Sequence, residues 1–494
     1  MFLEDSRTKT GQHMKSKRRE FLKIAGLTGA GITGGVLGSF TTGTGVQNFD
    51  NLPKHSRKLE TSHVQRFNMS GYAAPKIDAV RIGIIGLGNR GPTHMLPMSL
   101  IEGVEIKALC DLIPERVERA REKLKGTDHH PDLFSGGEYE WKKLCDRKDI
   151  NLVMITTPWY MHAEMAIYAM EQGKHVACEV PAAATIEDCW QLVETAERTR
   201  KHCMMMENYA FLPFQLLTLN MARRGFFGEI VHADCAYSTS KMDNNFRKNG
   251  YWDMWWLKQY ATRKGNIYPT HGLGPVCQIM DINRGDKLDF LVSIESKDFM
   301  MGARAKGLAA TDDFYKPFVG KDYRGNMNTT LIKTSKGRTI MLQHDATSPS
   351  PHNLIHGIYG TKGAALYDPQ PPRLSVGQHE WVSPGVYQSL QEKYRPKILT
   401  YTGKGSDWKG MDGHGGADML MDWHLIDCLR NGLPLDQDVY DAVTWSCILP
   451  LSEWSVNNHS NSIEIPDFTS GAWNSNKRNM DINLERGGIT KLKI

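Results

Sequence analysis

The chain has 494 residues, 40% of them hydrophobic, and its 60 basic and 55 acidic side chains give a net charge of +5. A chain of this length buries about three quarters of its unfolded surface, so it needs no disulfides for stability and forms roughly two or three domains. The charged fraction of 23% excludes wholesale disorder, and the nine cysteines include no C-x-x-C pair of the kind that binds zinc.

The positive charge is concentrated at the N-terminus. Residues 1–45 hold seven Lys or Arg and three Asp or Glu, a net +4, so the remaining chain carries about +1 and has no basic stripe for nucleic acid. Arg18-Arg19-Glu20-Phe21-Leu22-Lys23 precedes an uncharged, glycine-rich stretch from Ile24 to Phe40, which resembles a twin-arginine export signal. An N-terminal membrane anchor is the alternative, although this run is short and weak for a span.

We therefore expect residues 1–45 to be an export signal and residues 46–78 to be a polar linker. The twin-arginine translocase would carry the folded protein to the periplasm or another extracytoplasmic space. No later stretch reaches 18 consecutive apolar residues, so we predict no stable membrane span in the mature chain.

A nucleotide-binding pattern begins at Val80. The apolar run Val80–Ile85 predicts a buried parallel strand, and it leads into Gly86-Leu87-Gly88-Asn89-Arg90-Gly91 and a helix predicted over 94–101. The first glycine allows the tight turn, the second lets a pyrophosphate approach the backbone, and the third permits close helix–strand packing. The next strand, predicted over 104–110, ends at Asp111, where a carboxylate accepts ribose hydroxyls and favours NAD over NADP.

The alternation of strands and helices continues to about residue 207. The predicted strands span 150–156, 174–178 and 203–206, and the predicted helices span 162–172 and 186–201. Because ligands lie beyond the carboxyl ends of parallel strands, the residues that follow the strands should face one crevice. These residues are Asn89, Asp111, Trp159, His162, Glu179, Asn208 and Tyr209. Singly, Trp159 is more often packing, Glu179 a solvated loop acid and Asn208 a helix cap, but together they predict a binding site.

The pattern changes after about residue 225. Strands and hairpins are predicted over 229–237, 290–295, 329–334 with 339–344, and 355–360 with 364–367, and helices over 419–430 and 440–456. The sequence therefore predicts an α/β protein. An N-terminal Rossmann domain with a doubly wound parallel sheet (79–210) precedes an α+β domain (211–494). That second domain has a large, mostly antiparallel open sheet that forms the substrate wall.

Two segments of the second half carry candidate chemistry. Tyr251–Trp256 holds four aromatic side chains, whose faces suit sugars, although such clusters more often belong to a core or an interface. Tyr268-Pro269-Thr270-His271 places a histidine on a rigid turn that opens a helix. An isolated histidine is more often structural, but one opposite a nicotinamide is a candidate proton carrier.

These motifs together resemble the Gfo/Idh/MocA family of nicotinamide-dependent sugar oxidoreductases over roughly residues 79–465. Within it the chain is most similar to glycoside hydrolase family 109, the NAD-dependent α-N-acetylgalactosaminidases. The segments that carry the resemblance are Gly86–Gly91, Thr157–His162, Cys178–Pro181, Glu207–Tyr209 and Tyr268–Pro275.

The resemblance implies a glycosidase that uses NAD transiently. Hydride leaves sugar C3, the C2 proton is removed, the group on C1 is expelled, water adds at C1, and the hydride returns. It implies His271 near the C3 hydroxyl, Tyr209 near C2 and Glu179 positioning ribose or substrate, with roles that could be exchanged among the three.

The resemblance also implies the binding residues, with no metal among the ligands. The implied cofactor-binding residues are Gly86, Gly88, Asn89, Arg90, Gly91, Asp111, Trp159, Tyr160, Met161, His162, Glu179, Val180 and Asn208. The implied substrate-binding residues are Tyr237, Tyr268, Pro269, Thr270, His271 and His352.

Two positions depart from the patterns of these families. The oxidoreductase branch has Glu-Lys-Pro with a proton-transferring lysine where this chain has Val180, and the hydrolase pattern leads us to expect a tyrosine near His352. The alternatives are a sugar dehydrogenase of the same fold, an exported sugar-binding protein without turnover, and a conventional glycosidase with paired carboxylates. The sugar, its anomer, the aglycone and the oligomeric state, including a homo-oligomer, stay open.

Overall fold

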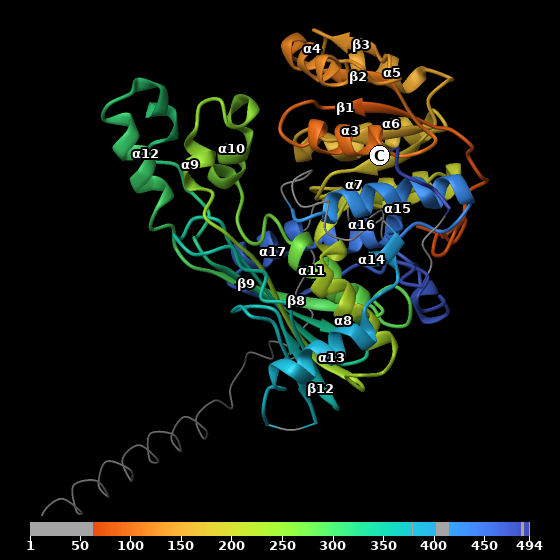
Figure 1. Cartoon of the computed structure of the whole chain (residues 1–494). Coiled ribbons are helices and arrows are strands. Elements are labelled where there is room, and N and C mark those ends of the chain that lie inside the picture. The colour runs from red at the N-terminus through yellow and green to blue at the C-terminus, as the bar shows by residue number, and fades with distance from the viewer. Residues whose placement is uncertain (1–62, 378, 402–413, 486–488, 494) are drawn as a thin grey trace, which may run out of the picture. The chain divides into compact units, whose positions relative to one another are not determined.

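The computed structural model describes residues 63–377, 379–401, 414–485 and 489–493, so the predicted export signal lies outside the described residues (Figure 1). The described part of the predicted linker packs against helices of the second half of the chain. Gln65 donates to the hydroxyl of Tyr440 at 2.9 Å, and the amide of Ile77 donates to the carbonyl of Leu429 at 3.1 Å.

The first sheet is parallel and six-stranded, in the order β3-β2-β1-β4-β5-β6. Its strands are β1 (Val80–Ile85), β2 (Val104–Asp111), β3 (Asp132–Ser135), β4 (Leu152–Ile155), β5 (His175–Cys178) and β6 (Cys203–Met205). Its helices are α3 (Gly91–Ser99), α4 (Pro114–Lys123), α5 (Glu140–Asp146), α6 (His162–Glu171) and α7 (Ile186–Thr199), with the short turns η2 (Trp159–Met161) and η3 (Asn208–Phe211). The strand order reverses between β1 and β4, which is where α/β sheets of this type open a ligand crevice.

The second sheet has eight strands in the order β13-β12-β11-β7-β10-β9-β8-β14. Its strands are β7 (Ile230–Ser238), β8 (Leu288–Glu295), β9 (Asn328–Thr334), β10 (Thr339–Asp345), β11 (Gly357–Gly360), β12 (Gly363–Leu366), β13 (Arg373–Val376) and β14 (Ile463–Glu464). All neighbouring strands are antiparallel except β7 and β10, which run parallel. The predicted fold class, a Rossmann sheet followed by a mostly antiparallel open sheet, is confirmed.

The second half also contributes many helices. They are α8 (Pro213–Arg223), α9 (Met242–Phe246), η4 (Trp252–Met254), α10 (Trp255–Thr262), α11 (Thr270–Ile279), α12 (Met301–Ala309), η5 (Asp313–Phe318), α13 (Pro384–Tyr394), α14 (Ile398–Tyr401), α15 (Ala417–Asn431), α16 (Val439–Ser446), α17 (Ile448–Asn457) and η6 (Ala472–Asn474). The single helix predicted over 440–456 was wrong, because the structure has two helices there. Pro450 has no amide hydrogen and its ring crowds the carbonyl four residues earlier, so α16 ends at Ser446 and α17 starts anew.

The two larger apolar cores both contain residues from the two halves of the chain. The larger core joins the Rossmann strands to α11, α15 and α16, so elements from both halves of the chain share one interior. The smaller core lies in α9, α10, α12 and η5, and it includes Trp159 from the Rossmann half. A loop after β4 is therefore packed into the second half of the chain.

None of the helices in the described part of the chain combines the length and the hydropathy that crossing a bilayer requires.

Candidate active site

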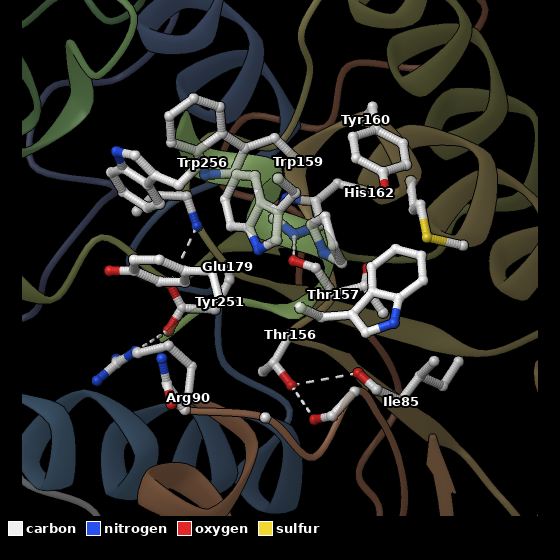
Figure 2. A pocket seen from close by; sticks show the side chains of 18 of the residues that line it. Ile85, Arg90, Thr156, Thr157, Trp159, Tyr160, His162, Glu179, Tyr251 and Trp256 are labelled. Carbon is white, nitrogen blue, oxygen red and sulfur yellow. Dashed lines mark hydrogen bonds and ion pairs between the residues drawn. The ribbon is translucent and has the colours of Figure 1, made fainter. Parts of the chain in front are cut away.

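A cavity of about 600 Å³ lies beyond the carboxyl ends of the Rossmann strands, and residues of the second half close its other side (Figure 2). Six of the seven residues expected at the strand ends line it: Asn89, Asp111, Trp159, His162, Glu179 and Asn208. Tyr209 is not among the lining residues. The residues at the carboxyl ends of the parallel strands thus lie together, as expected for ligand binding in an open α/β sheet.

The three glycines after β1 have different surroundings. Gly86 has φ +94°, a left-handed conformation that favours glycine, and a side chain there would clash with the backbone of Thr156. A Cβ on Gly91 would lie 2.1 Å from the carbonyl oxygen of Gly86, so the start of α3 can approach β1 only as glycine. A Cβ on Gly88 would meet only the guanidinium of Arg116, at 3.5 Å, and this face of the turn opens into the cavity.

Asp111 is held in place at the end of β2. Its Oδ2 accepts the amide of Leu87 at 2.6 Å, and its Oδ1 accepts the amide of Ile113 at 2.9 Å. The guanidinium of Arg116 lies 3.8 Å from Oδ1. Each carboxylate oxygen has a second lone pair, so the orientation is set while acceptor capacity is left for a ribose diol.

A buried ionic network joins the glycine turn to helix α15. Nε of Arg90 donates to Oε1 of Glu179 at 2.6 Å (Figure 2). Nη1 of Arg90 donates to Asp418 at 2.9 Å. His94 lies between Glu179 at 2.8 Å and Asp422 at 2.9 Å. Burial opposes ionisation of Glu179, but Arg90 and His94 outweigh it and hold its pKa well below the usual range. A carboxylate that stays charged and paired is better suited to positioning than to carrying protons.

The loop after β4 supplies the aromatic wall. The two ring nitrogens of His162 each lie 2.7 Å from a carbonyl oxygen, of Pro181 and Thr157, so this buried ring fastens the loops after β4 and β5 to each other. The ring of Trp159 stacks on Tyr268 with centroids 5.5 Å apart and meets Trp256 at 4.7 Å. His162 thus shapes the cavity wall, and Trp159 joins it to the second half.

The chemistry-bearing cluster is built around Glu207. Its Oε1 lies 2.7 Å from Nδ1 of His271, which is the second residue of α11, and accepts the amide of Tyr209 at 3.1 Å. The rings of His271 and Tyr209 stack with centroids 4.1 Å apart and planes inclined by 28°. With Nδ1 engaged by a carboxylate, Nε2 is the nitrogen of His271 that is left to exchange protons.

Two further side chains extend this cluster. The ring of Tyr237 lies 5.1 Å from that of His271, and the hydroxyl of Tyr209 lies 3.5 Å from Nε2 of His352. Burial, with Glu207 close by, raises the pKa of Tyr209, so its phenol is protonated at neutral pH. His352 is thus close to Tyr209, at the position where a tyrosine was expected.

Most of the predicted site residues line the cavity, and the others are not among its lining residues. The lining includes Gly86, Gly88, Asn89, Arg90, Asp111, Trp159, Tyr160, Met161, His162, Glu179, Val180, Asn208, Tyr237, Tyr268 and His271. The predicted residues outside the lining are Gly91, Tyr209, Pro269, Thr270 and His352. Sequence reasoning assigned no role to Glu207, because nothing local links it to a histidine 64 residues away. The position of Glu207 just after β6, at the carboxyl end of a parallel strand, was the signal that could have identified it as a site residue.

Comparison with known proteins gives the family. The C-terminal domain of glycosyl hydrolase 109 matches residues 214–475. A glycosyl hydrolase family 109 protein of Shewanella sp. (strain W3-18-1) is 43% identical over 467 residues, which cover 92% of this chain and 96% of that protein. A family 109 protein of Bacteroides fragilis (strain YCH46) is 43% identical over 427 residues, covering 82% of this chain and 89% of that protein.

The chain belongs to glycosyl hydrolase family 109. It is a glycosidase of this family, as the resemblance of its motifs implied. A further family member, from Shewanella oneidensis, is 42% identical over 467 residues, covers 92% of this chain with 96% of its own length, and bears the name alpha-N-acetylgalactosaminidase.

The Rossmann half of this family 109 protein matches the oxidoreductase family with an NAD-binding Rossmann fold over residues 80–207. Solved structures share the fold at low identity. An oxidoreductase domain protein from Kribbella flavida has a TM-score of 0.61 at 18% identity, and levoglucosan dehydrogenase in complex with NADH has 0.59 at 18%. Each covers 79% of this chain with its full length. NAD is the cofactor of the family 109 protein.

The residues present fit this cofactor. Gly88 leaves room at the turn where a pyrophosphate would approach, and Arg116 lies beside it to offset phosphate charge. Asp111 keeps acceptor capacity for the ribose, and Glu179 and Asn208 lie at the ends of β5 and β6. These side chains would hold NAD against the sheet edge, opposite His271.

Proposed function

We propose that the protein hydrolyses α-N-acetylgalactosaminides or related glycosides through a cycle of oxidation, elimination, addition and reduction that regenerates NAD in each turnover. The observation that carries this proposal is the cluster of Glu207, His271 and Tyr209 at the cavity. The printed name of the Shewanella oneidensis relative supports the choice of sugar. Val180, where the oxidoreductase branch has a lysine, disfavours the simple dehydrogenase.

The chain's own residues supply orientation and proton transfer. Nε2 of His271, oriented by Glu207, takes the proton of the sugar hydroxyl at C3. NAD held at this sheet edge would supply reversible hydride transfer with the sugar. Tyr209 takes the proton near C2 as its phenol passes its own proton to the neutral Nε2 of His352, 3.5 Å away, and the reverse transfer returns a proton to C2. A C–H bond beside a carbonyl is acidic enough for such a side-chain base. Glu179 stays anionic and fixes Arg90 at the glycine turn.

The test uses purified protein and a panel of α- and β-nitrophenyl glycosides, including N-acetylgalactosaminides. We expect nitrophenol release without net NADH, and NAD in about a one-to-one ratio to protein in the supernatant after denaturation. Net NADH with a free sugar would instead establish a dehydrogenase. Full activity in an NAD-free preparation would establish a conventional carboxylate glycosidase, and absence of turnover with every glycoside would favour a binding protein.

We further propose that the protein is exported by the twin-arginine route and acts outside the cytoplasm. A cofactor regenerated in each turnover suits a space without a nucleotide pool, and this route carries folded, cofactor-loaded proteins. Replacing Arg18 and Arg19 together by lysine should keep the protein in the cytoplasm, as cell fractionation would show. Unchanged export of that variant would contradict the proposal.

A further inference from the structure

Most of the acidic, basic and histidine side chains of the cavity wall have a protein partner. Arg90 is bound to Glu179 and Asp418, Arg116 lies near Asp111, and His271 is bound to Glu207. His414 is bound to Asp418 at 2.9 Å, and both ring nitrogens of His162 lie against backbone carbonyls. Among the Asp, Glu, Lys, Arg and His side chains of the lining that the structure describes, only those of Glu138 and Lys241 have no such partner.

The two exceptions belong to opposite parts of the site. Glu138 is exposed and follows β3, the outermost strand of the Rossmann sheet, so water solvates its carboxylate. Lys241 is partly buried and follows β7, the strand that carries Tyr237. Within the part of the chain that the structure describes, Lys241 is therefore the cation of the substrate side without a carboxylate partner.

The backbone of Lys241 is fixed. Its amide donates to the carbonyl of Ala346 just beyond β10, and its carbonyl accepts the amide of Asn245 in α9, both at 2.9 Å. The segment after β7 thus continues along the end of β10, so the backbone that carries the Lys241 side chain is fixed at the cavity wall. An ammonium group on a fixed backbone can hold a ligand group in a defined place.

The segment that carries Lys241 begins beside the cluster that carries the chemistry. Ser238, at the end of β7, pairs through its backbone with Asn353, the residue after His352. Burial, together with His271 and Lys241, lowers the pKa of His352. His352 in turn lies 3.5 Å from the hydroxyl of Tyr209. Lys241 therefore follows the strand end that adjoins His352, on the side of the cavity that carries Tyr237.

The environment of this ammonium is unfavourable until a ligand binds. The aromatic side chains of Tyr237, Tyr251, Trp255, Trp256 and Tyr268 line the same cavity and offer it no carboxylate. Burial lowers the pKa of Lys241, and none of the described acidic residues offsets it. Desolvating a charge without a partner costs free energy that an incoming anion would restore.

We propose that Lys241 binds an anionic substituent of the glycoside, so that the preferred substrates are acidic glycosides whose carboxylate or sulfate group lies near the reacting carbons. The aromatic walls contact the C–H faces of the sugar and the lysine selects its charge. This inference rests on the proposed glycosidase function and narrows its substrate class.

The experiment measures binding separately from turnover. The NAD-loaded protein is titrated calorimetrically with neutral N-acetylgalactosamine, with its 6-sulfate and with galacturonate, which distinguishes a sulfate from a carboxylate. The same titrations are made with Lys241→Gln, with Lys241→Arg, which keeps the charge, and with Lys306→Gln, which removes an exposed lysine of α12 outside the cavity.

We expect the wild type to bind at least one anionic sugar more tightly than the neutral one. A hydrogen bond to a charged group corresponds to about a tenfold to hundredfold change in affinity. Lys241→Gln should therefore raise the Kd of the anionic sugar by that factor. Its Kd for the neutral sugar should change less than about twofold. Lys241→Arg should retain most of the preference, and Lys306→Gln all of it.

Three results would overturn the inference: equal affinity of the wild type for neutral and anionic sugars, an equal loss for both in Lys241→Gln, or loss of bound NAD in that variant. The last would make Lys241 a cofactor contact. If no glycoside is turned over, the proposed function fails while the binding preference can still be read. A higher kcat/KM for acidic than for neutral aryl glycosides, lost in Lys241→Gln, would support both the glycosidase function and the role of Lys241.

Discussion

Glu207 is buried behind His271, and a single oxygen of its carboxylate holds both that imidazole and the amide of Tyr209. Glu207→Gln keeps the size of the side chain and removes its charge. We expect kcat to fall about tenfold to hundredfold, because a positioned base loses the anion that orients it, while KM changes less than about twofold. Steady-state kinetics with a nitrophenyl glycoside measures both quantities.

The matched control is Glu197→Gln. This buried carboxylate accepts the Tyr440 hydroxyl at 2.9 Å and the amide of Arg66 at 2.8 Å, and it does not line the cavity. It should affect the free energy of unfolding and leave kcat unchanged. A Glu207→Gln enzyme with normal kcat, or with reduced NAD content only, would contradict a positioning role toward His271.

His94 makes stability depend on pH on the alkaline side. Burial opposes its charged form, but Asp422 and Glu179 outweigh burial and raise its pKa to about 10. An unfolded histidine has a pKa of about 6.5, so the stabilisation is complete below that pH and is lost as the pH rises toward 10. We expect the Tm of NAD-saturated wild-type protein to fall between pH 7 and pH 10 and His94→Gln to flatten this decline, as differential scanning calorimetry would show.

An exposed histidine provides the comparison. His130 follows α4 and points to solvent, so His130→Gln should reproduce the wild-type decline of Tm with pH. A decline in His94→Gln as steep as in the wild type would assign the alkaline loss to other groups.

At the scale of elements, two glycines of the turn between β1 and α3 have different roles: Gly91 allows close packing and Gly88 leaves room for the cofactor. Gly91→Ala would place a Cβ 2.1 Å from the carbonyl oxygen of Gly86, so we expect a loss of about 2 kcal/mol or more in the free energy of unfolding. Gly88→Ala meets only a flexible guanidinium tip, so the apo-protein should keep its stability while NAD binds at least about tenfold more weakly. Thermal unfolding and NAD titration of the apo-protein measure the two effects.

Gly307→Ala in α12 is the neutral substitution for this pair, because a Cβ there meets no atom within 4 Å. It should leave NAD affinity unchanged and stabilise the helix slightly. If Gly88→Ala bound NAD as tightly as the wild type, the cofactor phosphates would not lie at this turn.

Helix α15 connects the second half of the chain back to the Rossmann turn. Asp418 on this helix accepts hydrogen bonds from Arg90 and Asn208, and removing one partner of a buried ion pair costs about 3–5 kcal/mol. Asp418→Asn should therefore lower the free energy of unfolding by that order and reduce retained NAD, because Arg90 is no longer held. Guanidinium unfolding and the NAD content after gel filtration report these changes.

The exposed pair of Arg198 and Glu171, at 2.9 Å, provides the contrast. Glu171→Gln should change stability by less than about 1 kcal/mol, because solvent screens exposed ion pairs. Equal effects of Asp418→Asn and Glu171→Gln would show that the buried network contributes little.

At the scale of the whole molecule, all nine cysteines are buried and none is in a disulfide. Burial raises the pKa of the Cys110, Cys145 and Cys203 thiols to about 12, and thiols that stay protonated react slowly. We expect almost no reaction of the folded protein with a thiol reagent, nine reacting thiols after denaturation, and no change of Tm with reductant. Rapid labelling of the folded protein would contradict this burial.

Local patterns predicted much of the fold. The strand at Val80–Ile85 has the predicted bounds, and the bounds of β2, β5, β6, β9 and β10 differ from the predictions by one or two residues. Strand β3 was missed because it is short and only partly buried, and α4 because its run of charges hides the apolar period. Such edge elements are stabilised by their neighbours more than by their own pattern.

The sequence by itself determined the Rossmann half, the glycine turn, Asp111 and the histidine at the start of α11, because apolar periodicity and turn chemistry are properties of consecutive residues. Only the tertiary structure decided that Glu207 orients His271 and that Asp418 pairs with Arg90 from 328 residues away. It also decided that Lys241 reaches the cavity without a carboxylate partner among the described residues. These pairings join residues that are far apart in the sequence. They form because both halves of the chain pack into one shared core, which brings the distant residues together.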